Sequence, residues 1–415
     1  MLRPTSVWAD LAFLFVRVVI HTVSDIIGLL CGRQRRQPGS VEVLRILARH
    51  KTDFSDDENF IYWHESNQPS SILLQPNWFV SKMTAKYAYF ALLPTTIENL
   101  EANAVPFLWI TFFQKAIKHA RMPIGEFCEF GRPIGPPKGR VTFIHNVPRC
   151  GSTLLCKMLQ VPSKNVIVLS EIEAICMLTY RKWNGKRNWD EDFVNRQLLP
   201  AVLNSICKNM TKSQLYIIKN QPHSVRQIEQ LRHSFPEVCH LFMFRRDIEA
   251  NMRSVIRLMS TNEGGWDRRL FDKLFFWCPA VCEALCVVGW FRTEMRFIQQ
   301  INPRNISETA AIVVGSVFAQ YEESKGHNDL VVFYEDLVEQ PKECMITLFK
   351  YCGIPLEMVD SAVDAMNDGD SQAGTWLSSA ELKKIPVEVT EADMARFRQI
   401  WKQISANVDH VLNQK

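Results

Sequence analysis

A short loop carries an arginine, a glycine and two hydroxyl side chains directly after the apolar run VTFIHN, residues 141–146. The run predicts a buried strand, and the residues after the loop predict a helix. Such a loop directs backbone N–H groups and the helix N-terminus at one point, which favours a bound anion. An ordinary helix start, capped by Ser152, is the alternative. The residues expected to form the anion site are Arg149, Cys150, Gly151, Ser152, Thr153 and Leu154.

The loop differs from the loop that binds ATP or GTP. That loop reads GxxxxGK[ST], and here its first glycine and its lysine are both absent. The cation comes before the glycine instead, as Arg149. In this respect the loop resembles that of the P-loop sulfotransferases, which holds the 5′-phosphate of 3′-phosphoadenosine 5′-phosphosulfate (PAPS). Its Val-Pro-Arg form is most similar to the branch that contains tyrosylprotein sulfotransferases and their uncharacterised relatives. Cys150 replaces the usual serine of that family, so one hydroxyl contact is missing.

A second feature of the resemblance is an arginine followed eight residues later by a serine, at a strand-to-helix junction. Arg246 and Ser254 have this separation in the segment FRRDIEANMRS. In the family these two residues hold the other phosphate of PAPS, so the resemblance implies the same role here. Asp247 stands at the expected helix start, where a carboxylate is favourable, and Ile248 replaces the usual proline. A solvated helix start is the alternative for this segment.

The resemblance also implies which residues carry the reaction. Sulfuryl transfer builds charge on the leaving oxygen, so fixed cations supply much of the catalysis. Arg149 and Lys219, at the end of the run LYIIK, are the expected cations, and no metal is required. The acceptor hydroxyl also needs a base. Glu171 stands where the tyrosylprotein branch has a glutamate. His223 is the alternative base, because Gln221 occupies the position of the usual histidine, and a plain helix cap is the alternative for Glu171.

Two later segments are similar to parts of the same family. VVFYEDLVEQPKECMITLFKYCGIP, residues 331–355, resembles its closing strand and helix, and we expect it to be mostly structural. DSQAGTWLS, residues 370–378, is similar in position to the loop over the 3′-phosphate. The resemblance spans about residues 140–356, and the first 130 residues match no family pattern.

The order of apolar and helical patterns predicts the fold class. Strands separated by crossover helices imply a parallel sheet with helices on both faces, here an α/β fold of the P-loop type. Ligands of such sheets gather at the carboxyl ends of the strands, where the loops above begin. The strand candidates are VTFIHN, VIVLS, LYIIK, CHLFMF and DLVVFY, within an expected domain at 140–415.

The N-terminal region is expected to be helical. Residues 1–36 are interpreted as an amphipathic or membrane-associated helix with a basic flank, and residues 41–130 as a helical extension. A membrane surface, docking on the protein itself and a true span are the alternatives for residues 8–31. The arginines that follow favour a cytoplasmic body over a Golgi-lumenal one. The polar interruptions Asp10, Arg17, His21 and Asp25 fall on one helical face, and the basic flank is Arg33, Arg35 and Arg36.

Composition excludes few functions. The 415 residues are 47% hydrophobic and carry a net charge of +4, which is too mild to indicate a nucleic-acid binder. Twelve cysteines without paired spacing predict free, mostly buried thiols. Cys278, Cys282 and Cys286 share one helical stripe, but no histidine or carboxylate joins them as a metal ligand.

The sequence therefore predicts a sulfotransferase that moves the sulfuryl group of PAPS to an acceptor hydroxyl by in-line displacement. An atypical P-loop kinase is one alternative. A catalytically weak protein that keeps the fold for binding or scaffolding is the other, because Cys150 and Gln221 depart from the family. The acceptor is a small molecule, a carbohydrate or a protein hydroxyl. The aromatic residues between Trp78 and Phe113 are interpreted either as an apolar acceptor pocket or as core.

Overall fold

The chain forms two compact units in this computed structural model. The first contains residues 1–140, 171–178 and 189–214, and the second contains the remaining segments, residues 141–170, 179–188 and 215–415. The chain therefore passes twice from the second unit back into the first, whereas the sequence suggested one continuous domain after residue 140. The structure describes residues 7–30, 36–50, 57–100, 106–160, 163–179, 189–259, 277–278, 295–375, 377–384 and 389–404.

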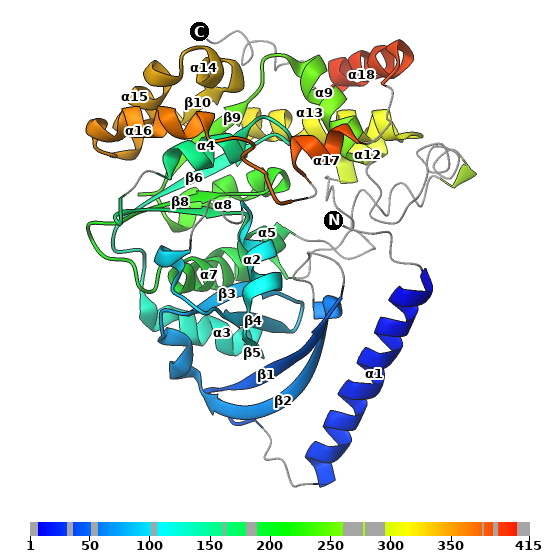
Figure 1. Cartoon of the computed structure of the whole chain (residues 1–415), viewed down its shortest axis with the longest axis vertical. Coiled ribbons are helices and arrows are strands. Elements are labelled where there is room, and N and C mark those ends of the chain that lie inside the picture. The colour runs from blue at the N-terminus through cyan, green and yellow to red at the C-terminus, as the bar shows by residue number, and fades with distance from the viewer. Residues whose placement is uncertain are drawn as a thin grey trace. The chain divides into compact units, whose positions relative to one another are not determined.

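The first unit is built on an antiparallel sheet of five strands in the order β2-β1-β5-β4-β3. Its strands are β1 (Ser40–Arg49), β2 (Phe60–Pro69), β3 (Trp78–Met83), β4 (Tyr87–Leu92) and β5 (Lys118–Pro123). Its helices are α1 (Val7–Leu30), α2 (Leu108–Lys115), α3 (Ile124–Gly131), α5 (Glu173–Cys176), α6 (Glu191–Phe193) and α7 (Leu199–Ile206). In Figure 1, α1 follows the outer edge of β2.

This sheet corrects the expectation of a helical extension at residues 41–130. In β1 the register against β2 shifts between Val43 and Leu44. The shift moves the alternation of buried residues by one position, so Val41, Val43 and Leu44 are all buried. A bulge breaks the strict alternation of buried and exposed residues, so the sequence pattern resembles helical spacing. The position of the bulge depends on the pairing with a neighbouring strand, which the local sequence does not show. The aromatic run from Trp78 to Phe113 is largely buried core.

The second unit is an α/β fold whose sheet has the order β10-β9-β6-β8-β7, flanked by helices (Figure 1). The pairs β6 with β9, β9 with β10, and β7 with β8 are parallel. Its strands are β6 (Arg140–Asn146), β7 (Val166–Ser170), β8 (Leu215–Lys219), β9 (Cys239–Phe244) and β10 (Leu330–Phe333). Its helices are α4 (Ser152–Leu159), α8 (Ile228–Ser234), α9 (Ile248–Met259), α12 (Met295–Ile301), α13 (Ile306–Ser324), α14 (Tyr334–Glu339), α15 (Pro341–Cys352), α16 (Val359–Asp364), α17 (Ser379–Lys383) and α18 (Glu391–Ile404).

The five apolar runs of the sequence form these five strands, so the predicted fold class is confirmed. Each run is nearly continuous in apolar residues because a parallel sheet is covered by helices on both faces. The thiols agree with the sequence as well, since Cys150, Cys156 and Cys352 are among the buried free cysteines. Of the expected cysteine stripe, Cys282 and Cys286 lie outside the described residues.

The order of strands reverses between β6 and β9. After β6 the chain continues to β7 on one side of the sheet, and after β9 it continues to β10 on the other side. Ligands of open α/β sheets bind at such a switch point, outside the carboxyl ends of the strands. The loops that follow β6 and β9 meet here, where Asn251 Nδ2 donates to Pro148 O over 2.8 Å.

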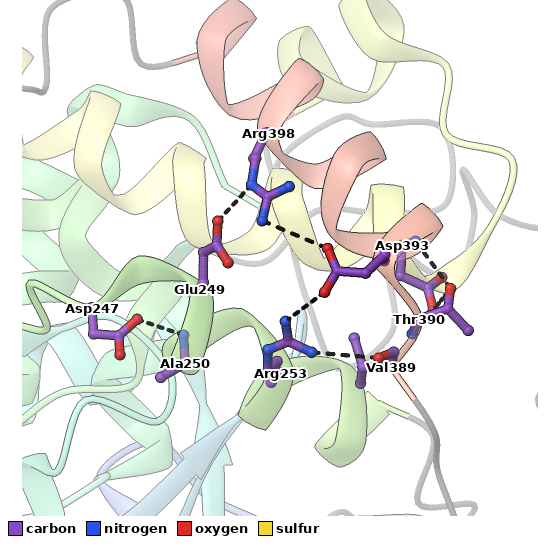
Figure 2. Close-up of polar contacts among 9 residues, drawn as sticks. Asp247, Glu249, Ala250, Arg253, Val389, Thr390, Asp393 and Arg398 are labelled. Carbon is purple, nitrogen blue, oxygen red and sulfur yellow. Dashed lines mark hydrogen bonds and ion pairs between the residues drawn. The ribbon is translucent and has the colours of Figure 1, made fainter.

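Helix α9, which follows β9, is held in place by the C-terminal helix α18. Figure 2 shows that Arg398 reaches Glu249 on α9, at 2.5 Å. Arg253 on α9 reaches Glu391 at 3.4 Å and the Val389 carbonyl at 3.4 Å. Two of these contacts are solvent-accessible ion pairs, which contribute little stability individually, and the third is a hydrogen bond to a backbone carbonyl.

Candidate functional site

The loop between β6 and α4 has an unusual backbone. Arg149 and Gly151 both adopt the left-handed region, with φ of 62° and 86°. A Cβ atom on Gly151 would lie 2.5 Å from the ring of Tyr334, so the glycine is required both for the conformation and for the space. α4 begins at Ser152, and its first N–H groups have no partner within the helix. The backbone of this loop therefore directs free N–H groups of α4 toward one point, a geometry compatible with a bound anion.

The Arg149 side chain connects this loop to α9 and to a C-terminal segment. Its Nε donates to Ser254 Oγ over 3.1 Å, and its Nη1 donates to Gln372 Oε1 over 2.8 Å. Burial is the main cause that lowers the pKa of Arg149, and Asp370 opposes this. Within the described residues, Arg149 forms no ion pair. A partly buried cation that is bonded to neutral oxygens is suited to receive an anion.

Gln372 is a site residue that sequence reasoning missed. Its Oε1 accepts from Arg149, and its Nε2 lies 3.3 Å from Thr153 Oγ1, so it bridges both sides of the loop. It belongs to the segment 370–378, which the sequence placed over the site, although Trp376 lies outside the described residues. The sequence pointed to the segment as a whole but not to Gln372, because a single amide side chain forms no recognisable motif.

Arg246 lies at the junction of β9 and α9, where the sequence placed it, but its side chain is bonded to a carboxylate. Its guanidinium forms two hydrogen bonds with the carboxylate of Asp336, one of them over 2.9 Å, and stacks 4.0 Å from the Phe333 ring. The hydrogen bond to Asp336 is the main cause that raises its pKa. The serine of the motif, Ser254, bonds Arg149 instead. The two members of the motif are thus attached to different partners.

The Tyr-Glu-Asp segment at 334–336 has the structural role that the sequence predicted, and it organises both motifs. Tyr334 packs against Gly151, and Asp336 binds Arg246. The Glu335 carboxylate accepts from the backbone N–H groups of Arg246 and Asp247, at 2.9 and 3.1 Å. Asp247 in turn caps α9 by accepting from Ala250 N over 2.8 Å (Figure 2), which confirms its expected place at the helix start. The segment therefore positions both motifs.

The remaining candidate residues lie at or near the ends of strands. Lys219, the last residue of β8, is buried and pairs in register with Ser170, the last residue of β7. His223 is buried in the 3₁₀ helix Pro222–Gln227. Burial raises the pKa of the Cys150 thiol to about 11, so this side chain is a neutral thiol at physiological pH.

Glu171 belongs to the first unit and directly follows β7. Its φ of 56° is unusual for a residue with a side chain, and such strain persists where the surroundings enforce it. Its Oε2 accepts from the Trp109 indole Nε1 over 3.2 Å. The indole hydrogen bond orients the carboxylate, and this contact could not be read from the sequence.

Comparison with known proteins gives similarity of fold only. No protein-family model matches the chain, and no curated protein matches its sequence. The solved structures that resemble it are sulfotransferases. One from Alicyclobacillus acidocaldarius is 11% identical, with 68% of this chain and 97% of that chain covered and a TM-score of 0.40. Mouse sulfotransferase SULT7A1 complexed with PAP is 12% identical, with 70% and 92% covered and a TM-score of 0.40. Sulfotransferase STF1 from Mycobacterium tuberculosis is 14% identical, with 65% and 79% covered and a TM-score of 0.35. Function must therefore be argued from the site.

Proposed function

We propose that this protein is a PAPS-dependent sulfotransferase that transfers a sulfuryl group to an acceptor hydroxyl. The observation that carries the proposal is Arg149, a partly buried cation bonded to neutral oxygens. It lies in a strand-to-helix loop at the point where the sheet order reverses. The loop lacks the lysine that ATP- and GTP-binding loops place after the glycine, which favours a different phosphate-bearing ligand.

The residues present fit a nucleotide with two phosphate groups. Arg149, the hydroxyls of Ser152 and Thr153, and the first N–H groups of α4 would hold the 5′ end of PAPS. Arg246 and Ser254 would hold the 3′-phosphate, and both follow β9, the strand beside β6. To bind the 3′-phosphate, the Arg246 guanidinium would release the Asp336 carboxylate and bond the phosphate oxygens instead. Both side chains are partly exposed, which permits this change of partner.

In the proposed reaction, PAPS supplies the sulfuryl group. The S–O bond to the 5′-phosphate breaks as the S–O bond to the acceptor oxygen forms, and a base takes the acceptor proton. Arg149 and Lys219 would stabilise the charge on the leaving oxygen. Glu171 is the proposed base, because the Trp109 indole fixes its carboxylate. The acceptor is a hydroxyl of a carbohydrate, a lipid-like alcohol or a tyrosine, and the Val-Pro-Arg loop favours testing the tyrosine first.

A thermal-shift titration with 3′-phosphoadenosine 5′-phosphate (PAP), run beside ATP with magnesium, tests the proposal. A ligand that binds only the native state raises the apparent stability by mass action. We expect stabilisation by PAP. Stabilisation by ATP and magnesium alone would overturn the proposal in favour of a kinase. If neither ligand stabilises the protein, a scaffold that binds no nucleotide is the better description.

Arg246→Ala is expected to weaken PAP binding about 10-fold, because one charge-assisted phosphate contact contributes about 1.5 kcal/mol. AMP lacks the 3′-phosphate and serves as the internal control. Its affinity should stay the same in the variant. Calorimetric titration of both nucleotides checks this, and an equal loss for PAP and AMP would place Arg246 at the 5′ end instead.

Glu171→Gln is expected to lower kcat about 100-fold while leaving PAP affinity unchanged, since a positioned base typically contributes at least this much. Glutamine keeps an oxygen that can accept from Trp109, so the local structure should be retained. His223→Gln is the matched comparison. Sulfuryl transfer from labelled PAPS measures both variants, and a loss confined to His223→Gln would transfer the role of the base to His223.

A further inference from the structure

Three polar side chains of α1 bind the backbone of the edge strand β2. The Arg17 Nε donates to Phe60 O over 3.1 Å, and Tyr62 N donates to His21 Nε2 over 3.0 Å. His64 N lies 3.5 Å from Ser24 Oγ. The helix residues are four and three positions apart, and the strand residues are two apart, so one stripe of α1 follows one row of backbone groups on β2.

This contact explains the polar interruptions of an otherwise apolar segment. β2 is an edge strand, and an edge strand leaves every second residue with an unpaired N–H and C=O that invite association. Residues 60, 62 and 64 supply the backbone groups that α1 binds, and they alternate along β2 as the outward-facing groups of an edge strand do. Arg17 also reaches Asp57 over 2.8 Å, which fixes the helix at the start of the strand. The polar stripe of α1 is therefore used within the protein.

The opposite side of α1 is apolar and exposed. Phe15 is 70% exposed, and Leu29 and Leu30 are each 82% exposed. A helix on the surface of a globular protein normally has the reverse arrangement, with its apolar side inward. The other exposed apolar side chains of the helix are Leu11, Leu14, Val16, Val18, Val19, Val23, Ile26 and Ile27.

We propose that α1 docks the protein on an anionic lipid bilayer and lies flat in its interface, with the polar stripe on β2 and the apolar side in the lipid. The helix has 24 residues, and 11% of its apolar stretch Leu11–Leu30 is buried. At 1.5 Å per residue it presents an apolar side of about 36 Å. Such helices insert their apolar side into the boundary between headgroups and acyl chains.

The width and the charge of this side favour lipid over a protein partner. Exposed apolar residues occur at successive positions such as 14, 15 and 16, so they cover about half of the circumference, whereas a helix partner covers a narrow seam. Among residues 11–30, Asp25 is the exposed acidic side chain, and it lies one turn after His21, beside the polar stripe. The sequence places Arg3 before the helix and Arg33 and Arg35 after it, which suits anionic headgroups.

The stripe also distinguishes lying in the interface from crossing the bilayer. In a span, Arg17 and His21 would enter the hydrocarbon and leave the backbone of β2 without these partners. Both changes are costly. The flat orientation keeps all the observed bonds and covers only the exposed side.

Flotation of the full chain with vesicles tests the proposal. We expect the protein to float with phosphatidylcholine vesicles that contain 30 mol% phosphatidylserine, about 10-fold less with phosphatidylcholine alone, and to be released by alkaline carbonate. Phe15→Glu/Ile26→Glu should lower partitioning at least 30-fold. Both positions are exposed, and glutamate is a good helix former, so the fold is retained.

Leu74→Glu/Ile117→Glu is the matched control, since both residues are exposed apolar side chains outside α1. This variant should float like the wild type. Failure of the wild type to float, or equal flotation of the Phe15→Glu/Ile26→Glu variant, would overturn the proposal. Resistance to carbonate would indicate a span. A dimer in light scattering that dissociates in the Phe15→Glu/Ile26→Glu variant would instead assign the apolar side to a second copy of the chain.

Discussion

Arg149→Met is expected to weaken PAP binding about 1000-fold while changing the stability of the free protein by less than about 1 kcal/mol. The loss of affinity follows from removing two charge-assisted donors from a site with partly excluded water, which together contribute about 4 kcal/mol. The free protein loses little, because among the described residues Arg149 is bonded to the neutral oxygens of Ser254 and Gln372 and its charge is partly desolvated. Methionine keeps the unbranched stem and the packing of the arginine.

Calorimetric titration with PAP gives the affinity, and urea unfolding without ligand gives the stability. Arg253→Met is the matched control, because Arg253 lies on α9 and pairs with Glu391, away from the loop. The control should bind PAP as the wild type does. An Arg149→Met variant that binds PAP normally would show that the arginine does not hold the cofactor. A variant that unfolds in the absence of ligand would show that the arginine has a structural role.

Acidification to pH 5 is expected to lower the stability of the second unit by at least about 2 kcal/mol through a buried histidine pair. His145 Nε2 and His240 Nδ1 lie 3.0 Å apart, and both rings are buried among Phe143 and Phe242. Burial, followed by the charge of Arg232, lowers the pKa of His240 to about 3. Burial, then His240 and Arg232, lowers the pKa of His145 well below its usual value.

The direction of the effect follows from where protons bind. The folded pKa values lie below the unfolded value of about 6.5, so the unfolded chain takes up protons first as the pH falls. The stabilisation is complete above pH 6.5 and declines below it, down to about pH 3 for His240. At pH 5 His240 alone costs about 2 kcal/mol of stability, and His145 acts in the same direction.

Urea unfolding at pH 7 and pH 5, followed by a probe in the second unit, measures the loss. His233→Gln is the control, because His233 is exposed and should leave the pH dependence unchanged. The double variant His145→Phe/His240→Leu should reduce the dependence of the unfolding free energy on pH, whatever its effect on stability at pH 7. A variant that keeps the full acid loss would show that other groups cause it.

The sequence by itself determined the sheet of the second unit. Runs such as LYIIK are nearly continuous in apolar residues, which is typical of a strand covered on both faces, and all five runs form strands. The strand-to-helix loop was also legible, because Gly151 and the hydroxyls beside it form a local pattern that depends on a few consecutive residues. The same holds for Asp247, whose capping role depends only on the next turn of its helix.

The tertiary structure alone decided which distant groups meet. Gln372 bonds Arg149 across more than two hundred residues, and Asp336 pairs with Arg246. No spacing in the sequence relates these positions. Much of residues 41–130 forms the strands of a sheet, with only the helices α2 and α3, because strand pairing between distant segments overrode the local pattern. Helix α1 combines a feature that the sequence predicted with one that depends on the tertiary structure. Its amphipathic pattern was predictable, whereas the direction of its polar side depended on the unpaired edge of β2.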